Sequence, residues 1–179
     1  MLYTTIYKSP LGEATIASDG KGISGLWLEG QKYFAASIKE KTREEDDRRE
    51  FHIVKEWLDQ YFAGGNPPLS QLPLTPRGTE FQRRIWDILC QIPYGKLTTY
   101  GEMAKEMAAL MGRKSMSSQA VGGAVGHNPI SIIIPCHRVV GSNGSLTGYA
   151  GGIHRKVALL ELEGADMSGL YVPAKGTAL

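Results

Sequence analysis

Hydrophobic positions in the first 28 residues come in short runs that polar turn sequences separate. The apolar runs cover residues 2–7, 13–17 and 22–28, and the turn sequences between them are Ser9-Pro10-Leu11-Gly12 and Asp19-Gly20. Short runs joined by such turns are typical of antiparallel strands connected as hairpins. The start of the chain is therefore predicted to form an antiparallel meander.

A single helix is predicted to follow the meander and to pack on it. Within residues 51–62 the apolar side chains recur at helical spacing, at Phe51, Val54, Trp57, Leu58, Tyr61 and Phe62. The dense mixed charge of residues 39–50 is expected to be a solvated helix or loop. Residues 64–78 are rich in glycine and proline and are interpreted as a linker, which places one domain at residues 1–76.

After the linker, the spacing of apolar residues is that of helices. Helices are predicted at about residues 79–92, 99–111, 118–125 and 153–162. Thr79 with Gln82, and Thr99 with Glu102, have the separation of a capping box, in which each side chain bonds the other residue's backbone N–H. The polar residues 112–117 separate the second of these helices from the third, which predicts a helix-turn-helix.

The helix predicted at residues 118–125 has small side chains. It contains Gly122-Gly123, although glycine inside a helix costs about 1 kcal/mol relative to alanine. Tight packing against another helix would explain the pair, and so would close approach of another backbone such as a DNA strand, with the first preferred. The expected fold class is α/β (α+β), with a small N-terminal antiparallel sheet domain and a helical C-terminal domain at residues 77–179.

The main chemical signal is a cysteine next to two basic residues. Residues 130–134 are mostly isoleucine and are predicted to form a buried strand, which Pro135 ends. Cys136, His137 and Arg138 follow, and nearby positive charge favours a thiolate, so the pKa of Cys136 is expected to be lowered. A buried structural cysteine is the alternative, since free cysteine is among the most buried residue types.

Three further features bear on this cysteine. Glu163 lies at the C-terminal end of the last predicted helix, where the helix dipole disfavours an acid, so a compensating partner is expected, with His137 as the candidate. The five glycines of residues 141–152 predict a flexible loop, too irregular for a phosphate-binding motif. Cys90 has no activating neighbour in its predicted helix and is assigned to packing.

Composition limits the class of protein. Hydrophobic residues make up 42% of the chain, as in ordinary globular proteins, and two cysteines do not make a disulfide framework. No signal peptide is visible in residues 1–7 and no apolar run could span a membrane, so a cytoplasmic protein without membrane association is expected. The net charge is −2 over residues 1–76 and +4 over residues 77–179, a weak indication of a polyanionic partner.

Residues 79–164 resemble the catalytic domain of the O6-alkylguanine-DNA alkyltransferases, also called methylated-DNA–protein-cysteine methyltransferases. The motifs that carry the resemblance are Ile92-Pro93-Tyr94-Gly95 followed by Tyr100, Ala120 to Ala124, Asn128-Pro129, Pro135 to Val139, Gly148 to Gly152, and Glu163-Gly164. Their number and order, over about half the chain, make the signal specific. The first half is similar to the family's small sheet domain, which implies a ribonuclease H-like fold there.

The resemblance implies DNA repair by a suicide reaction. The family binds double-stranded DNA by the minor groove, flips out an O6-alkylguanine and moves its alkyl group to a cysteine that is not regenerated, and O4-alkylthymine is implied as a second substrate. By position, Cys136 would take the alkyl group, and His137 would deprotonate it through a water. Glu163 would orient His137, and Asn128 would support that hydrogen-bond chain.

The resemblance also implies contacts with the base and with DNA. Tyr100 would donate a proton or a hydrogen bond to the purine N3, and the Ala150 N–H would bond O6. The carbonyls of Cys136 and Val139 would read the exocyclic amine, and Tyr149 belongs to the same substrate-binding set. DNA contacts would come from Ser118, Gln119, Ala120, Gly122, Gly123 and Arg138. A monomer without cofactor or metal is expected, since the zinc site of some relatives cannot be placed in an N-terminal half that lacks cysteine.

One position departs from the family pattern. The family usually has an arginine directly before Ala-Val-Gly-Gly-Ala, where it fills the space that the flipped base leaves, and this chain has Gln119. Glutamine can insert and hydrogen-bond, but it brings no charge and stacks less well than a guanidinium. Less efficient repair of duplex DNA is therefore expected, with the alkyl transfer itself unaffected.

Two other functions are compatible with the same residues. A Cys-His-Glu triad could hydrolyse an acyl group with many turnovers, whereas an alkyltransferase reacts once. A helix-turn-helix protein could bind lesions or regulate without chemistry, although family members of that kind replace the cysteine that is present here as Cys136. The mass of the protein after incubation with O6-methylguanine DNA separates the three functions.

Overall fold

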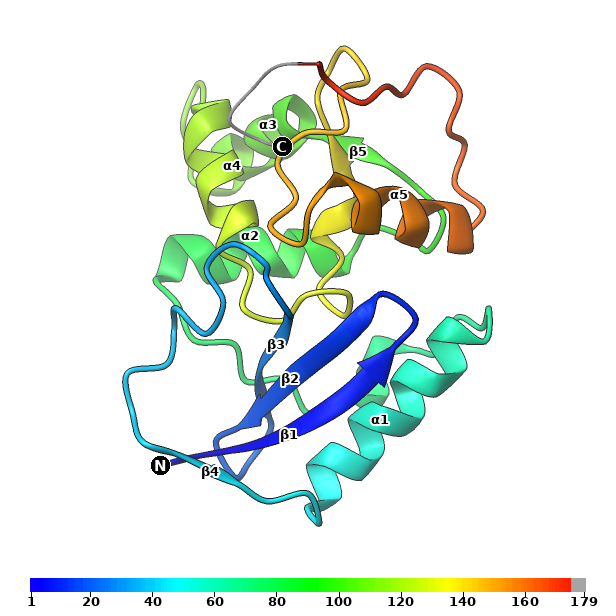
Figure 1. The fold of residues 1–179 in the computed structure, drawn as a ribbon. Helices are drawn as coiled ribbons and strands as arrows, with labels where there is room; N and C mark the ends of the chain where they lie inside the picture. The colour runs from blue at the N-terminus through cyan, green and yellow to red at the C-terminus, as the bar shows by residue number, and fades with distance from the viewer. Residues whose placement is uncertain (175–179) are drawn as a thin grey trace. The chain divides into compact units, whose positions relative to one another are not determined.

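A computed structural model describes residues 1–174 of the chain (Figure 1). The chain forms two compact units. The first contains Met1–Gly78 together with Pro129–Ile133, and the second contains Thr79–Asn128 and the residues from Ile134 onward. A division at residues 76/77 would leave Pro129–Ile133 out of the first unit, so the units are not simply consecutive.

The first unit is built on a four-stranded sheet with the strand order β3-β2-β1-β4. Its strands are β1 (Leu2–Ser9), β2 (Gly12–Ser18), β3 (Ile23–Leu28) and β4 (Thr42–Glu44). The first three pair antiparallel, which confirms the predicted meander. The short β4 pairs parallel to β1 and is exposed along its length, so part of the charged run predicted to be helix or loop is an edge strand.

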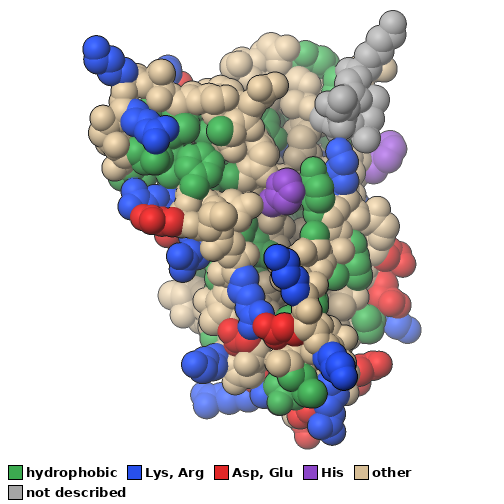
Figure 2. Space-filling view, turned by 90° about the vertical axis from the view of Figure 1, so that its left-hand side faces the viewer, with side chains coloured by type: hydrophobic (Ala, Val, Ile, Leu, Met, Phe, Trp, Pro, Cys, Tyr) green, Lys and Arg blue, Asp and Glu red, His purple; other side chains and the backbone are tan. Residues whose placement is uncertain are grey.

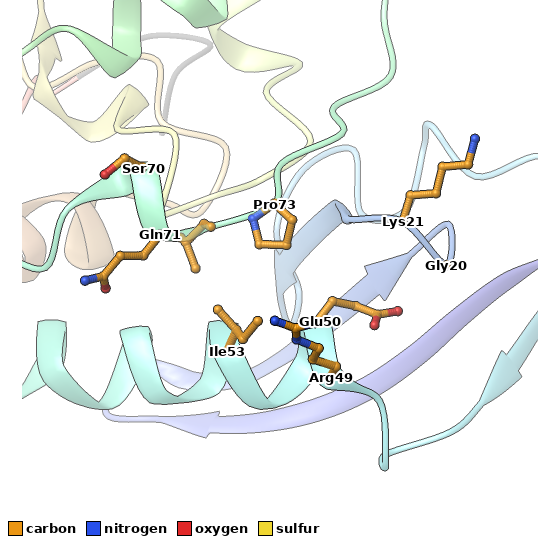
Figure 3. Close-up of a pocket in the computed structure, with 9 residues that line it drawn as sticks. Gly20, Lys21, Arg49, Glu50, Ile53, Ser70, Gln71 and Pro73 are labelled. Atoms are coloured by element: carbon orange, nitrogen blue, oxygen red, sulfur yellow. The ribbon is translucent and has the colours of Figure 1, made fainter.

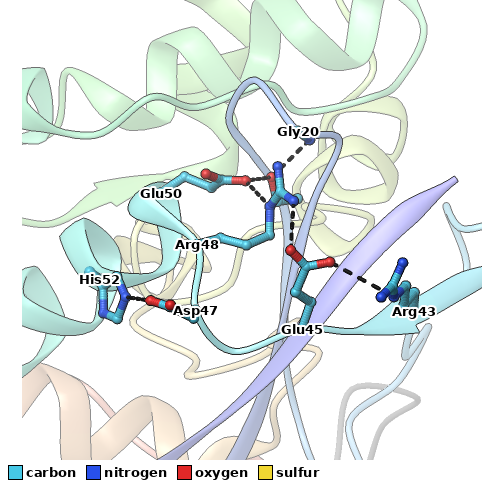
Figure 4. Close-up of polar contacts among 8 residues, drawn as sticks. Gly20, Arg43, Glu45, Asp47, Arg48, Glu50 and His52 are labelled. Atoms are coloured by element: carbon cyan, nitrogen blue, oxygen red, sulfur yellow. Dashed lines mark hydrogen bonds and ion pairs between the residues drawn. The ribbon is translucent and has the colours of Figure 1, made fainter.

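One helix, α1 (Arg49–Phe62), contacts β1, β2 and β3 (Figure 1). Its buried side chains include Phe51, Val54, Leu58 and Tyr61, as the helical spacing predicts. At its start, Glu50 accepts hydrogen bonds from Arg48 Nε and Ser18 Oγ, both at 2.7 Å (Figure 4). Since Ser18 ends β2, this network ties the sheet to the first turn of the helix.

The residues predicted to be a linker are attached to the first unit. Trp57 Nε1 donates to the Pro68 carbonyl at 3.1 Å, next to the short 3-10 helix η1 (Leu69–Gln71). Ile23 N–H donates to the Pro73 carbonyl at 2.6 Å, so the segment also pairs with the start of β3. Together with the start of α1, this segment lines an open pocket of about 500 Å³ (Figure 3).

The strand predicted at residues 130–134 is absent, and that prediction was wrong. Leu26 donates to the Pro129 carbonyl at 2.8 Å and accepts from Ser131 N–H at 3.0 Å, and the chain then turns. Ile132 has φ of 72°, which a β-branched residue rarely adopts. The isoleucines at 130, 132, 133 and 134 are all buried, so burial in turns explains the apolar composition that suggested a strand.

The second unit contains four α-helices among its described residues. They are α2 (Glu80–Cys90), α3 (Tyr100–Leu110), α4 (Ser118–Gly126) and α5 (Ile153–Leu162), and β5 (Thr98–Thr99) pairs parallel to β6 (Val139–Val140). The capping box at Thr79 is complete. At Thr99 only half of it forms, because the Glu102 side chain pairs with Lys105 at 3.2 Å instead of returning to the backbone.

The predicted helix-turn-helix is formed by α3 and α4, which pack on each other and on α2. Val121, Ala124 and Val125 form the buried side of α4. A Cβ added at Gly123 would meet nothing within 4 Å, and one at Gly122 would only touch Tyr100 at 3.8 Å. Tight helix packing therefore does not explain the glycine pair. None of the helices described here is both long and apolar enough to span a bilayer.

Candidate active site

Cys136 begins a short 3-10 helix, η2 (Cys136–Arg138), and is only 5% exposed. Asn128, just after α4, donates from Nδ2 to the Cys136 Sγ at 3.2 Å and to the Ile134 carbonyl at 2.8 Å. A single amide thus holds the backbone before the cysteine and contacts its sulfur. The supporting role expected for Asn128 stays a prediction.

The pKa of the Cys136 thiol is raised, because burial outweighs the stabilising effects of the Asn128 hydrogen bond and of the Lys156 charge. The prediction of a lowered pKa was wrong for this state of the protein. It assumed that Arg138 would act on the sulfur, whereas the Arg138 guanidinium is bound to Glu163. Cys90 is partly buried, and desolvation raises its pKa to about 11, consistent with a packing role.

The Glu163 carboxylate is buried and accepts hydrogen bonds from three residues. Its Oε2 receives His137 Nε2 at 2.6 Å and Arg138 Nη2 at 3.1 Å. Its Oε1 receives Arg138 Nε at 2.7 Å and the Gly95 N–H at 3.1 Å. His137 is therefore a hydrogen-bond partner of Glu163, as expected, but the charge of Glu163 is compensated by Arg138.

These contacts fix the tautomer of His137. A carboxylate only accepts, so Nε2 carries the hydrogen, and Nδ1 of the neutral ring is an acceptor. Nδ1 is buried and has no hydrogen-bond partner among the described residues. Burial lowers the pKa of His137, and the charges of Arg138 and Lys156 lower it further, against the opposing effect of Glu163. The ring is thus a neutral base with one available nitrogen.

The turn Ile92-Pro93-Tyr94-Gly95 is folded around the Glu163 carboxylate. Gly95 has φ of 74°, and an added Cβ would lie 2.8 Å from the Glu163 carbonyl oxygen, so only glycine fits. Arg138 Nη1 donates to the Ile92 carbonyl at 2.6 Å. The sequence identified this turn as a family motif, but it did not predict that the turn binds the Glu163 carboxylate.

Two tyrosines lie beside the cysteine. Tyr100 donates to the Thr147 carbonyl at 3.1 Å, and an added Cβ at Gly148 would lie 2.3 Å from the Tyr100 oxygen. The Tyr149 hydroxyl is buried, with no hydrogen-bond partner in the described part of the chain. Burial raises the pKa of both hydroxyls, and the nearby Cys136 adds to this, so both remain protonated donors.

Lys156 belongs to this site, although the sequence did not single it out. It lies on the buried side of α5, three residues after Ile153, and its side chain is fully buried. Its Nζ donates to the Val139 carbonyl and, at 3.0 Å, to the Thr147 carbonyl. Desolvation lowers its pKa to about 8. The sequence feature that could have identified Lys156 is its place on the apolar face of a predicted helix, where a lysine is rarely found.

The residues expected to contact DNA fall into two groups. Ser118, Gln119, Ala120 and Gly123 are exposed on α4, with Gly122 partly exposed beside them. Arg138 is 8% exposed and bound to Glu163, and its expected contact with DNA stays a prediction. On the face drawn in Figure 2, lysine and arginine side chains are scattered rather than gathered in one patch. On that face, therefore, positive charge does not mark out a DNA surface.

Comparisons with known proteins give a consistent result. Residues 2–76 match the profile described as 6-O-methylguanine DNA methyltransferase, ribonuclease-like domain, and residues 80–165 match its DNA binding domain. A methylated-DNA–protein-cysteine methyltransferase of Haemophilus influenzae is 43% identical over 90% of this chain and 86% of its own length. Another, of Methanosarcina acetivorans, is 41% identical over 92% of this chain and 99% of its own length.

A solved structure is similar over most of the chain. The Mycobacterium tuberculosis OGT in complex with DNA has 41% sequence identity and a TM-score of 0.77. The match covers 90% of this chain and 91% of that one. The similarity therefore extends over both compact units.

Proposed function

The chain belongs to the methylated-DNA–protein-cysteine methyltransferase family, and we propose that it repairs DNA by moving the alkyl group of an O6-alkylguanine onto its own Cys136. The observation that carries the residue assignment is the available Nδ1 of His137, a neutral base that Glu163 fixes beside the cysteine. Neither a hydrolase nor a binding-only regulator is favoured by the comparisons.

The chemistry requires a thiolate and a leaving group. The thiol proton of Cys136 passes to His137, directly or through a water, and the resulting imidazolium is stabilised by Glu163. The sulfur then bonds the alkyl carbon, and the carbon–O6 bond breaks with its electron pair left on the guanine. The guanine takes up one proton in place of the proton that the thiol lost, so a neutral base and a neutral thioether result.

Donors near the cysteine suit the departing base. The protonated Tyr100 hydroxyl, which donates to the Thr147 carbonyl in this structure, is assigned to the purine N3 when the base is bound, and the backbone N–H of Ala150 is assigned to O6. The carbonyls of Cys136 and Val139 are assigned to the exocyclic amine. Val139 already accepts from Lys156, and a carbonyl oxygen can accept a second hydrogen bond. Tyr149 supplies part of the surrounding wall.

The helix-turn-helix is assigned to the duplex. The exposed residues of α4, from Ser118 to Ala120 and at Gly122 and Gly123, would lie against the minor groove, where the absence of side chains at the glycines lets backbones approach. Gln119 would enter the space left by the flipped base. We assign O6-alkylguanine and O4-alkylthymine as substrates of a cytoplasmic monomer.

The test is the intact mass of the protein after incubation with duplex DNA that carries O6-methylguanine. One added CH2 per protein, mapped to Cys136, is expected, with the same result for Cys90→Ser and none for Cys136→Ser. An unmodified protein that still turns over acyl substrates would identify a hydrolase. Binding of lesion DNA without either reaction would identify a regulator.

A further inference from the structure

Lys156 is a buried cation whose described hydrogen bonds include no carboxylate. Its Nζ donates to the backbone carbonyls of Val139 and Thr147. The nearby carboxylate, Glu163, has its two oxygens occupied by His137, Arg138 and Gly95. Burying a charge without a partner costs free energy of folding. A charged lysine at a fully buried position is therefore expected to have a counter-charge.

The charges in the site do not balance while the cysteine is a thiol. Arg138 and Lys156 are cations and Glu163 is an anion, with His137 neutral. The groups that could supply a further negative charge are Cys136 and the hydroxyls of Tyr100 and Tyr149. Burial keeps both hydroxyls protonated, which leaves the sulfur of Cys136. Ionising it gives Lys156 an anionic partner, and the net charge of the site becomes zero once the thiol proton has left His137.

We propose that Lys156 is a positioning residue that provides the counter-charge of the Cys136 thiolate. The electrostatic interaction works in both directions, since Lys156 lowers the pKa of Cys136 and Cys136 raises the pKa of Lys156. The two carbonyl contacts fix the position of the ammonium, in the same buried site as Cys136. This inference rests on the proposed function, in which the thiolate attacks the alkyl carbon.

Alkylation has a consequence for the lysine. A thioether cannot carry negative charge, so the modified protein leaves Lys156 buried without a counter-charge. The pKa of Lys156 is therefore expected to fall once Cys136 is capped. A lysine that served only to hold the two carbonyls would not respond to the state of the sulfur.

The first experiment measures the rate of Cys136 alkylation by iodoacetamide against pH, in a Cys90→Ser background. Lys156→Met removes charge and donors, whereas Lys156→Gln removes the charge and keeps an N–H donor. Both should raise the midpoint of the profile by about one pH unit or more, about a tenfold slower reaction below the midpoint. The exposed Lys105→Met is the matched control and should leave the midpoint unchanged.

The outcomes of this experiment decide between charge and structure. An unshifted midpoint in both Lys156 variants overturns the proposal. A shift in Lys156→Met alone also overturns it, because the lost donor and not the lost charge would then be responsible. A midpoint, unlike a rate, does not move when a variant merely loosens the access of the reagent to the sulfur.

A second measurement needs no Lys156 variant and covers the case in which these fail to fold. The pKa of Lys156 is followed by NMR in Cys90→Ser protein before and after capping Cys136 with methyl methanethiosulfonate, which leaves a neutral sulfur. A lower pKa after capping is expected, and an unchanged one overturns the proposal. The mass shift with O6-methylguanine DNA, measured on the same preparation, separates this failure from failure of the proposed function.

Discussion

At the scale of single residues, the geometry of the site depends on the Glu163 carboxylate. Its four contacts come from the turn at Gly95 and from the two residues that follow Cys136. It fixes the tautomer of His137 and neutralises Arg138. Replacing it by an amide therefore changes both the chemistry and the stability of the protein.

Glu163→Gln is expected to slow alkyl transfer to free O6-benzylguanine about 100-fold, because His137 loses its orientation and the anion that stabilises its protonated form. The free energy of unfolding should fall by about 3 kcal/mol, since Arg138 is left as an unpaired buried charge. Affinity for duplex DNA should be retained. Second-order rate constants, denaturant unfolding and DNA titration measure the three effects.

The control for this variant is Glu161→Gln, an exposed acid two residues earlier at the end of the same helix. It should change neither rate nor stability measurably. A Glu163→Gln protein that transfers at the full rate would remove Glu163 from the mechanism.

The sequence predicted part of this residue network. An acid at a helix C-terminus next to a family motif led to the pairing of Glu163 with His137, which the structure places at 2.6 Å. The partners of Arg138 and Lys156 could not be predicted, because they depend on which way each side chain turns inside the folded unit. Adjacency in sequence suggested that Arg138 acts on the sulfur, and long-range contacts decided otherwise.

At the scale of elements, α4 is the helix whose sequence departs from the family pattern. Gln119 is exposed in its first turn, where a longer side chain would meet no obstacle from the rest of α4. An inserted side chain recovers part of the unstacking energy of a flipped base. A guanidinium adds charge and a stacking plane.

Gln119→Arg is expected to speed repair of duplex DNA several-fold while leaving the reaction with free O6-benzylguanine nearly unchanged, because the free base needs no flipping. Rate constants for both substrates are compared at one salt concentration, since added charge alone raises DNA affinity. Single-stranded DNA is the control. An equal gain on single and double strands would mean an electrostatic effect only, and no gain on the duplex would mean that Gln119 lies elsewhere.

The start of α1 gives a prediction about pH. Burial raises the pKa of Glu50, but the hydrogen bonds from Arg48 and Ser18 outweigh it, and the net shift is downward (Figure 4). A carboxyl with a lowered pKa in the folded state contributes stability above its unfolded pKa, and this contribution is lost as the pH falls through the folded pKa.

Glu50→Gln should therefore lower the free energy of unfolding by about 1 kcal/mol at neutral pH. The difference from the unmodified protein should shrink in acid, where Glu50 itself becomes protonated. Denaturant unfolding over a pH series tests both statements. Glu44→Gln, an exposed acid in β4, is the control and should show no difference at either pH. A pH-independent loss for Glu50→Gln would assign it to packing.

Most elements could be predicted from local patterns, and the exceptions have a common cause. The meander, α1 and the four helices after it follow hydrophobic periodicity and capping residues. The run at residues 130–134 has strand composition but turns at Ile132, after backbone hydrogen bonds with Leu26 at Pro129 and Ser131. β4 has no apolar residue and forms through pairing with β1, which no local pattern reveals.

At the scale of the whole molecule, the first unit is not one continuous stretch of chain. Pro129–Ile133 belongs to it, with two backbone hydrogen bonds to Leu26 and a contact between Ser131 Oγ and Gln31 at 3.2 Å. Burial of each isoleucine side chain contributes about 1.5–3 kcal/mol. The composition of residues 1–78 gave no sign of this dependence.

Residues 1–78 produced alone should therefore be markedly less stable than the same unit in the full chain. Thermal unfolding should occur at a lower temperature, with binding of a hydrophobic dye at neutral pH. A peptide covering residues 128–134 should restore part of the stability in a concentration-dependent way, and a scrambled peptide should not. A fragment as stable as the unit in the full chain would show that Pro129–Ile133 contributes little.

The return of Pro129–Ile133 to the first unit also limits how such proteins can be recombined. In a chimera, residues 1–78 would come from one family member and the rest of the chain from another. The sheet of the first protein would then pack against Pro129–Ile133 of the second, in the stretch just before the cysteine. Mismatched packing of these isoleucines would be transmitted directly to the next residue, Ile134, whose carbonyl is bound by the same Asn128 amide that contacts the sulfur. Replacing residues 1–78 alone would therefore also change the packing next to the active site. Replacing Pro129–Ile133 together with them would avoid this.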